Sequence, residues 1–150
     1  MSEKCLVIPT NTLLKKHFLG FVSKDFFNYM SIINNKNHQY FLLRKETSNE
    51  QKLPVEEDAS FQQPIVYAII KNKDKIFLYQ RSTKEIIGEP RLALKYSIGV
   101  GGHIELIDDS ADLIISSLKR EIQEELGYKG KFKIRHIGYL NLENDIVDKV

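Results

Sequence analysis

The chain has 150 residues, enough for one domain with a sizeable core. Hydrophobic residues make up 42% and charged residues 28%, which is typical of a globular protein and excludes a disordered one. The net charge of +2 is small, and acidic and basic residues are mixed along the chain, so neither a specific nucleic-acid partner nor a membrane surface is indicated.

Cysteine usage and apolar runs predict the compartment. Cys5 is the only cysteine, so an internal disulfide is excluded and a reducing compartment fits. The first residues lack the apolar core of a signal peptide, and no apolar run approaches the roughly 20 residues of a membrane span. We therefore predict a soluble, cytoplasmic protein with no membrane partner.

The first 64 residues contain two predicted strands. Residues 5–9 form a short apolar run, and residues 39–45 are rich in aromatic and aliphatic side chains. Residues 13–33 are ambiguous, because their apolar spacing is nearly helical but Gly20 interrupts it. Residues 46–64 are polar and acidic and contain two prolines, which predicts a surface loop or linker.

The rest of the chain predicts a hairpin, one helix and further strands. Residues 65–70 and 75–81 flank a turn-prone centre, which is typical of a β-hairpin. A short strand over 93–105 leads into two glycines, residues 110–126 are predicted to be helical, and residues 131–142 to be a strand. This order predicts a mixed α/β (α+β) layer structure.

The predicted helix has one apolar stripe and clear end signals. Asp109 or Ser110 can cap its start, and Gly127 fits the left-handed position just past its end. The apolar stripe faces a core and consists of Ala111, Ile114, Ile115, Leu118, Ile122 and Leu126.

Three glutamates near the end of this helix suggest more than a solvated face. Glu121, Glu124 and Glu125 fall within a sector about 100° wide. They lie where the helix dipole disfavours negative charge, and Glu121 and Glu125 form a like-charge i,i+4 pair. A divalent cation such as Mg²⁺ or Mn²⁺ would reverse this unfavourable electrostatics, since both ions prefer clustered oxygen ligands. An ordinary solvated helix face is the alternative.

In their order, these residues resemble the Nudix hydrolase family (MutT-like proteins). Its signature is Gly, five residues, Glu, seven residues, Arg-Glu, an aliphatic residue, any residue, Glu-Glu, any residue, Gly and an aliphatic residue. The segment "GGHIE" at 101–105 is similar to the opening, with Gly102 as the signature glycine. The later part, "REIQEELGY", supplies Arg120, Glu121, Ile122, Glu124, Glu125 and Gly127, with Tyr128 in place of the final aliphatic residue.

The first half of the signature departs from the family pattern. Nine residues rather than five separate Gly102 from Asp112, whereas Asp112 keeps the seven-residue gap to Arg120. We interpret this as a loop that is four residues longer between the glycine turn and the helix. Whether Asp112 pairs with Arg120, as the family's glutamate does with its arginine, stays open.

The resemblance implies roles for individual residues. Glu121, Glu124 and Glu125 would be carboxylate ligands of Mg²⁺ or Mn²⁺, and the Gly101 carbonyl a further ligand. Arg120 would be a salt-bridge partner that orients these carboxylates. Family members cleave a phosphoanhydride bond in nucleoside diphosphates linked to another group, and the cations orient the diphosphate and acidify the attacking water. Glu124 or Glu125 would be the general base.

Other polar residues are weaker candidates. Arg81 follows a predicted strand at a place where many family members have a basic residue near the diphosphate, and a surface arginine is an equally good interpretation. His103, beside the glycine turn, could touch substrate or a metal-bound water, although such a histidine is more often simply packed. Arg91 and Lys95 are weaker candidates still. No cluster of functional residues surrounds the remaining histidines, so we predict structural roles for His17, His38 and His136.

The resemblance also implies an α/β/α sandwich with a mixed sheet. The family's sheet continues beyond the signature, but only residues 129–150 follow here, so we expect the last strands and helix to be lacking. We divide the chain into an extension, 1–60, that packs on the core, and a C-terminally short Nudix domain, 61–150. Three explanations compete: truncation of a longer protein, a layer filled by the N-terminal region, and a homodimer that completes the sheet. We favour truncation, with association of two chains as its consequence.

The predicted function is a metal-dependent hydrolase that takes a small-molecule diphosphate. The alternative is a non-catalytic Nudix-type domain that binds a nucleotide or a partner protein. An isomerase of isoprenoid diphosphates ranks last, because Cys5 lies far from the signature. The identity of the substrate is not predicted, since loops outside the signature determine it.

Overall fold

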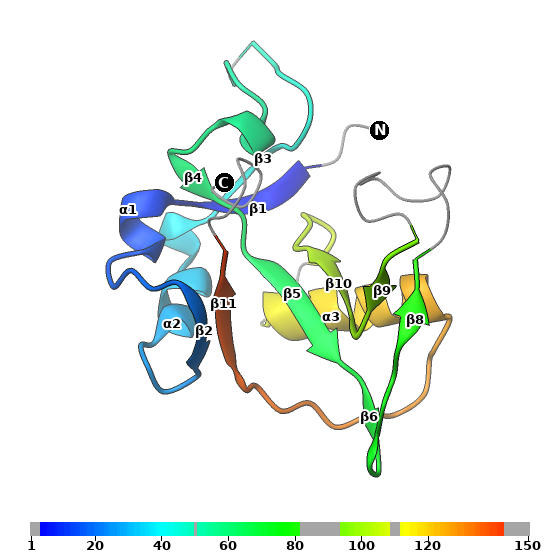
Figure 1. Cartoon of the computed structure of the whole chain (residues 1–150). Coiled ribbons are helices and arrows are strands. Elements are labelled where there is room, and N and C mark those ends of the chain that lie inside the picture. The colour runs from blue at the N-terminus through cyan, green and yellow to red at the C-terminus, as the bar shows by residue number, and fades with distance from the viewer. Residues whose placement is uncertain (1–3, 50, 82–93, 109–111, 143–150) are drawn as a thin grey trace.

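A central antiparallel pair of strands positions the glycines. The structure is a computed structural model, and it describes residues 4–49, 51–81, 94–108 and 112–142. Strand β5 (Ile65–Ile69) pairs with β10 (Gly99–His103) over its whole length. Helix α3 (Leu113–Leu126) packs across both strands, as Figure 1 shows.

Strand β5 alternates between two environments, as its sequence predicts. Val66 is buried in the core and Ala68 packs against that core. Ile65, Tyr67 and Ile69 point the other way and are about half exposed. The buried set is therefore the set that faces α3, because alternate residues of a strand lie on opposite faces.

The predicted hairpin is correct at its tip and wrong in its main pairing. Strands β6 (Lys71–Asn72) and β7 (Lys75–Ile76) pair around a turn in which Lys73 has a φ of 53°. Beyond the tip, β5 pairs with β10, while β8 (Tyr79–Gln80) pairs with β9 (Tyr96–Ser97). The two arms diverge because each finds its partner in the later segment 96–103.

The first strand of the chain lies in the core. Strand β1 (Lys4–Pro9) pairs with β3 (Tyr40–Leu43) on one side and β4 (Phe61–Gln62) on the other, and α1 (Thr10–Leu13) follows it. Its residues Cys5, Leu6, Val7 and Ile8 are fully buried. The Leu6 amide donates to the Ile104 carbonyl at 2.7 Å, which ties the N-terminal region to the strand that carries the glycines.

The ambiguous segment 13–33 contains a strand and a short helix. Strand β2 (Gly20–Ser23) begins at a glycine with a φ of 74°, and α2 (Tyr29–Ile33) begins after Asn28, whose side chain caps it. Strand β2 pairs antiparallel with β11 (Gly138–Asn141). Figure 1 shows this pair beside α2, so the N-terminal region and the last described strand form one side of the molecule.

Two predictions for the connecting segments need correction. The segment 46–64 is not only a surface loop: it forms η2 (Val55–Glu57), and Val55 is 1% exposed and packs with Cys5 and Val7. The predicted strand 131–142 shrinks to β11, because no described strand lies beside residues 131–137 to pair with them. A 3₁₀ turn, η1 (Lys36–His38), precedes β3.

An aromatic cluster joins the N-terminal region to β11. Tyr29 is 2% exposed, and its ring lies 4.8 Å from that of Tyr139 and 5.4 Å from that of Phe18. Such tilted and edge-on contacts are the favoured geometries for aromatic pairs. The same core includes Ile104 and Ile122, so residues from both halves of the chain share one hydrophobic cluster.

The ends of α3 agree with the sequence signals in part. Gly127 has a φ of 64° and caps the C-terminus, as predicted. The N-terminal cap is Asp112, whose side chain accepts from the Ile115 amide at 3.1 Å, and neither predicted cap holds this place. Asp109 and Ser110 themselves, with Ala111, lie outside the described residues.

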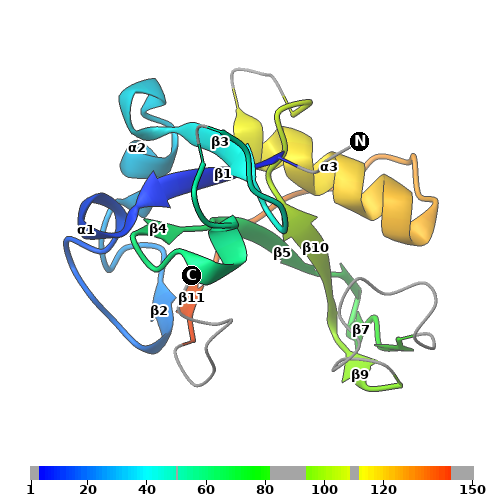
Figure 2. The same cartoon turned by 90° about the horizontal axis from the view of Figure 1, so that it is seen from above.

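The predicted fold class is confirmed: the chain is an α+β protein with small sheets and few helices. Every strand pair within the described ranges is antiparallel, so the parallel pairings of a mixed sheet are not among them. The division at residue 60 stays a prediction. Figure 2 shows β1 and β3 beside β5 and β10, with α3 to one side.

Candidate functional site

Helix α3 places the signature residues beside the glycine strand. Glu121 is 8% exposed and faces β10, whereas Glu124 and Glu125 are exposed on the same part of the helix. The stripe that includes Leu118 and Ile122 is buried in the core and fixes the rotation of the helix. The three carboxylates therefore lie along one edge of α3 next to Gly101 and Gly102.

Arg120 is the centre of a network of acidic side chains. One guanidinium nitrogen donates to Glu121 Oε1 at 2.7 Å and to Glu124 Oε2 at 3.1 Å, and lies 3.4 Å from Glu105. Another donates to the His103 carbonyl at 2.8 Å. The Arg120 side chain is 13% exposed, so this is a largely desolvated network. It holds two of the three signature glutamates in defined positions.

Asp108 is the carboxylate that binds Arg120 most completely, and this role was not predicted from the sequence. Its two oxygens accept from Nε and from a terminal nitrogen of Arg120, both at 2.9 Å, and the residue is 2% exposed. Asp112, the residue first matched to the family's glutamate, caps α3 instead. Counted forward from Gly102, Asp108 follows after five residues, so the signature spacing is intact there. The four extra residues come after Asp108, at 109–112.

Charge and burial shift the protonation equilibria in this network. Burial on its own would raise the pKa of Asp108, but the hydrogen bonds from Arg120 and the Glu105 amide outweigh it and lower that pKa. The hydrogen bond from Asp108 raises the pKa of Arg120 further above its usual value. Burial raises the pKa of Glu121, and the positive charge of Arg120 offsets only part of this effect. The charge of Glu121 is thus only partly compensated by Arg120.

Gly101 and Gly102, two of the three glycines of β10, are required by close approach rather than by unusual backbone angles. A Cβ at Gly102 would lie 2.6 Å from a carboxylate oxygen of Glu121, so glycine leaves the space in which that carboxylate sits. A Cβ at Gly101 would lie 1.9 Å from the Val66 carbonyl oxygen, so glycine there is needed for β5 to pair with β10. The Gly101 amide also donates to Glu125 Oε1 at 3.2 Å.

The weaker candidates lie around this centre. Arg81 follows β8, and its guanidinium lies 5.9 Å from the ring centre of Tyr79, a residue that touches Glu125. His103 takes part through its carbonyl, which accepts from Arg120 and from Ser117. Lys95 accepts from the Arg81 amide through its backbone, and Arg91 lies outside the described residues.

The structure gives specific contacts or burial for two of the three histidines that we predicted to be structural. His136 lies 3.2 Å from the Gly138 carbonyl and edge-on to Tyr139. His38 belongs to η1, far along the chain from the signature, and its buried Nδ1 atom makes no hydrogen bond. His17 also has interaction partners.

The side chains as placed do not enclose a cation. Within the described part of the chain, no three histidine, cysteine or carboxylate groups converge closely enough to hold a metal ion. The reason is geometric: Glu121 and Glu124 point toward Arg120, while Glu125 points toward the Gly101 amide. The donor types nevertheless fit a hard cation, because every candidate ligand is an oxygen.

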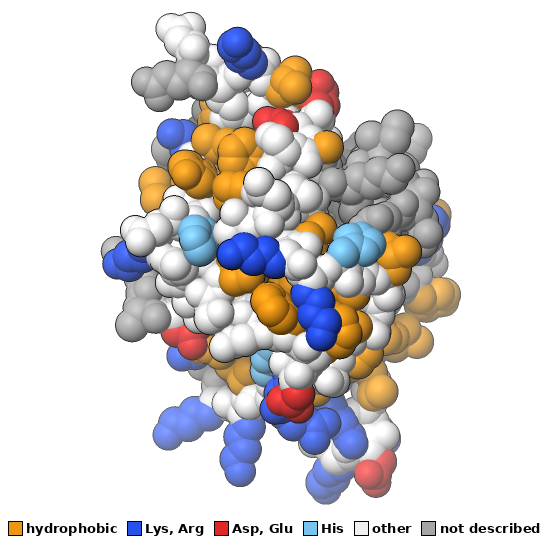
Figure 3. All heavy atoms as spheres, turned by 90° about the vertical axis from the view of Figure 1, so that its left-hand side faces the viewer, with side chains coloured by type: hydrophobic (Ala, Val, Ile, Leu, Met, Phe, Trp, Pro, Cys, Tyr) orange, Lys and Arg blue, Asp and Glu red, His pale blue; other side chains and the backbone are white. Residues whose placement is uncertain are grey.

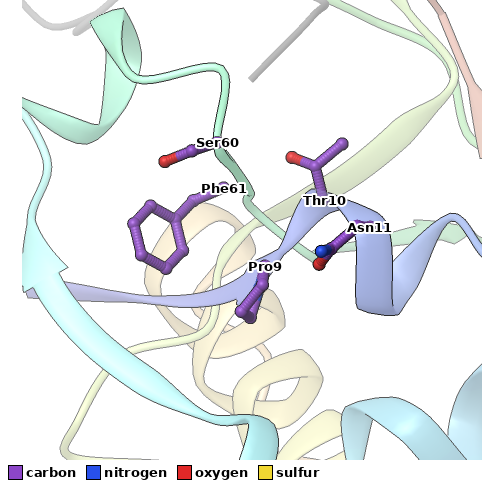
Figure 4. Close-up of a pocket in the computed structure, with 5 residues that line it drawn as sticks. All are labelled: Pro9, Thr10, Asn11, Ser60 and Phe61. Atoms are coloured by element: carbon purple, nitrogen blue, oxygen red, sulfur yellow. The ribbon is translucent and has the colours of Figure 1, made fainter.

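A surface depression of about 510 Å³ lies away from this network. Figure 4 shows its lining residues, which come from the junction of β1 and α1 and from the start of β4: Pro9, Thr10, Asn11, Ser60 and Phe61. None of these side chains is titratable, and none belongs to α3 or β10. The depression therefore does not contribute to the candidate site.

Basic side chains gather at one end of the molecule, the lower end in Figure 3. Figure 1 places two segments there, the β6–β7 hairpin and the connection between α3 and β11. Their exposed basic residues are Lys71, Lys73, Lys75, Lys129, Lys131, Lys133 and Arg135. A positive region that begins four residues after Glu125 attracts anions toward the C-terminal end of α3. Separately, no helix among the described residues is long and apolar enough to cross a membrane.

Comparisons with known proteins agree with the signature and the fold. No family model matches the chain. Protein YmaB of Bacillus subtilis (strain 168) is 34% identical over 158 aligned positions, which cover 100% of this chain and 72% of YmaB. The crystal structure of Tm1382, a protein provisionally assigned to the Nudix hydrolases, superposes with a TM-score of 0.72 at 24% identity. The match covers 99% of this chain and 71% of Tm1382.

A fold that places Arg120, Glu121, Glu124 and Glu125 on one helix beside Gly101 and Gly102 is that of a Nudix protein. The chain belongs to the Nudix hydrolase family. Its relationship to YmaB extends over the whole sequence, including the N-terminal region that packs through β1 and β2.

Proposed function

We propose that this chain is a metal-dependent hydrolase of a phosphoanhydride bond in a nucleoside diphosphate derivative or a related small molecule. The observation that carries this proposal is the placement of Glu121, Glu124 and Glu125 along one edge of α3, next to the glycine strand β10. Arg120 and Asp108 support that edge from the side of the core. Family membership supports the same reaction class.

The residues present fit Mg²⁺ or Mn²⁺. Glu121, Glu124 and Glu125, with the Gly101 carbonyl, offer the oxygen donors that these ions prefer. Glu121 is buried without full charge compensation, which a cation would supply, and Gly102 leaves room for its carboxylate. Glu124 has a side chain that is 57% exposed, so it can turn toward an ion. When bound, the ion would polarise the phosphoanhydride and acidify the attacking water.

The protein's own residues would orient the substrate and move a proton. Arg120 fixes Glu121 and therefore the direction of its oxygens, a task on which metal affinity usually depends. Arg81 and His103 would contact the diphosphate. Glu124 is our first choice for the general base, with Glu125 second, since Glu125 Oε1 already accepts from the Gly101 amide.

Turnover of a substrate panel tests the proposal. Nucleotide sugars, dinucleotides, ADP-ribose and nucleoside triphosphates are incubated with Mg²⁺ or Mn²⁺, and phosphate-containing products are quantified. At least one substrate should be cleaved, and Glu124→Gln should lower kcat by 10²-fold or more, the usual contribution of acid–base catalysis. Glu57→Gln is the matched control, because Glu57 is exposed on η2 and belongs to the other half of the chain.

The result that rejects the hydrolase is also defined. If no substrate is cleaved with either metal, or if Glu124→Gln and Glu57→Gln have equal activity, the proposal is wrong. Binding of a nucleotide without cleavage would support the alternative, a non-catalytic Nudix-type domain. One observation favours that alternative: Arg120 already holds the carboxylates of Glu121 and Glu124.

Two further expectations belong to this proposal. Cys5 is buried and unbridged, which supports a reducing compartment and hence the cytoplasm. Association of two chains also stays a proposal. The exposed apolar side chains of β5, namely Ile65, Tyr67 and Ile69, support it, since surfaces of this kind are common in contacts between subunits.

A further inference from the structure

We propose that Tyr79 is a positioning residue for the carboxylate of Glu125. Tyr79 lies on β8, 46 positions before Glu125, and does not belong to the Nudix signature. Its hydroxyl is one of two donors that hold the carboxylate. The part of this inference that concerns metal binding rests on the proposed function, in which Glu125 is a ligand.

The two oxygens of Glu125 accept from different donors. The Tyr79 hydroxyl donates to Oε2 at 3.1 Å, and the Gly101 amide donates to Oε1 at 3.2 Å. Two donors, one on each oxygen, fix the plane of a carboxylate as well as its position. Glu125 is exposed near the end of α3 and would otherwise sample several rotamers.

The proton of the Tyr79 hydroxyl has a preferred acceptor. The Gly99 carbonyl also lies within reach, at 3.2 Å from the same hydroxyl, and one proton cannot serve both acceptors fully. That carbonyl already accepts from the Ser97 hydroxyl at 2.9 Å. The carboxylate of Glu125 is charged and is therefore the stronger acceptor. The arrangement directs the Tyr79 proton to Glu125.

Tyr79 is itself held in place. It pairs with Ser97 between β8 and β9, and its ring stacks on that of Phe77 with centroids 5.6 Å apart and an interplanar angle of 23°. The guanidinium of Arg81 lies 5.9 Å from the ring centre. Because its strand is paired and its ring is stacked, Tyr79 loses little conformational entropy when its hydroxyl binds the carboxylate of Glu125. Residues that hydrogen-bond to a metal ligand in this way influence metal affinity.

The test measures Mn²⁺ binding by electron paramagnetic resonance of the free ion, with no substrate present. Tyr79→Phe keeps the ring and removes only the hydroxyl, so the fold should be retained, which a thermal unfolding curve checks. We expect its Mn²⁺ dissociation constant to rise by about 10-fold, the lower end of the range for outer partners of metal ligands. Tyr40→Phe is the matched control, because Tyr40 lies on β3 in the N-terminal region and its ring packs edge-on against Phe61.

The double variant Tyr79→Phe/Glu125→Gln separates positioning through Glu125 from an unrelated loss. It should bind Mn²⁺ no more weakly than Glu125→Gln alone, because the hydroxyl acts only through that carboxylate. The inference is overturned if Tyr79→Phe binds Mn²⁺ as tightly as the wild type does, if Tyr40→Phe loses as much affinity, or if the double variant shows an additive loss. Failure of the wild-type protein to bind Mn²⁺ at all refutes the proposed metal site, and this inference with it.

Discussion

Replacing Asp108 by alanine should destabilise the protein more than any other single loss in the acidic network. The change removes two charge-assisted hydrogen bonds to Arg120 at 2.9 Å and the acceptor of the Glu105 amide at 2.8 Å. Each bond to a charged group contributes about 1.5–3 kcal/mol. Arg120 keeps Glu121 as a partner, so the expected loss is about 3 kcal/mol, the lower end of the range for breaking a buried pair.

Urea and thermal denaturation measure this loss. A decrease of about 3 kcal/mol lowers Tm by roughly 6–12 °C in a domain of this size. Asp25→Ala is the surface control: Asp25 pairs with Lys24 but is 76% exposed, so the change should stay within about 1 kcal/mol. Asp112→Ala removes the N-terminal cap of α3, which contributes about 1 kcal/mol. If Asp112→Ala costs as much as Asp108→Ala, our assignment of the arginine's partner is wrong.

Three further outcomes follow from the site. The wild type should have a larger free energy of unfolding than Asp108→Asn. This difference should be complete above about pH 3.9, the unfolded pKa of an aspartate, and should shrink as the pH falls through the lowered folded pKa. Urea titrations from pH 2 to pH 7 check this, and an undiminished difference at pH 2 contradicts it. Gly101→Ala should lower the stability by at least about 2 kcal/mol, since its Cβ would meet the Val66 carbonyl. Gly127→Ala meets no neighbouring atom, and it should lower the stability by about 1 kcal/mol because of the positive φ. Equal losses of stability on urea denaturation would reject the clash at Gly101. Mg²⁺ or Mn²⁺ should raise Tm of the wild type but not of Glu121→Gln, because only a bound ligand stabilises the native state, and equal shifts would place binding elsewhere.

Local signals predicted the elements that depend on local structure. The apolar period of 110–126 and Gly127 locate α3 to within a few residues, because a helix and its glycine cap are built from neighbours in sequence. Pairing between distant strands was not predicted. The pattern of 131–137 alternates as a strand would, but a strand needs a partner, and the described neighbours of this region supply one only for β11. Partners for β5 were misjudged for the same reason.

The candidate site was predictable as far as its residues share one helix. Arg120, Glu121, Glu124 and Glu125 follow from the signature, and α3 brings them together. Asp108 was missed because the spacing was counted back from Arg120 rather than forward from Gly102, although the five-residue gap was visible in the sequence. Tyr79 had no signal at all in the sequence, because its contact with Glu125 exists only through the pairing of β8 with β9.

The pairing of β2 with β11 delays the completion of folding during synthesis on the ribosome. Residues 20–23 leave the exit tunnel early, and their partners at 138–141 are made last among the described strands. At synthesis rates of about 5–20 residues per second, β2 waits on the order of ten seconds with its edge unpaired. During that interval the ring of Tyr29 lacks the ring of Tyr139, which lies 4.8 Å from it in the folded protein, and is open to chaperones. The protein reaches its native state only after residues 138–141 have been made and have paired with residues 20–23.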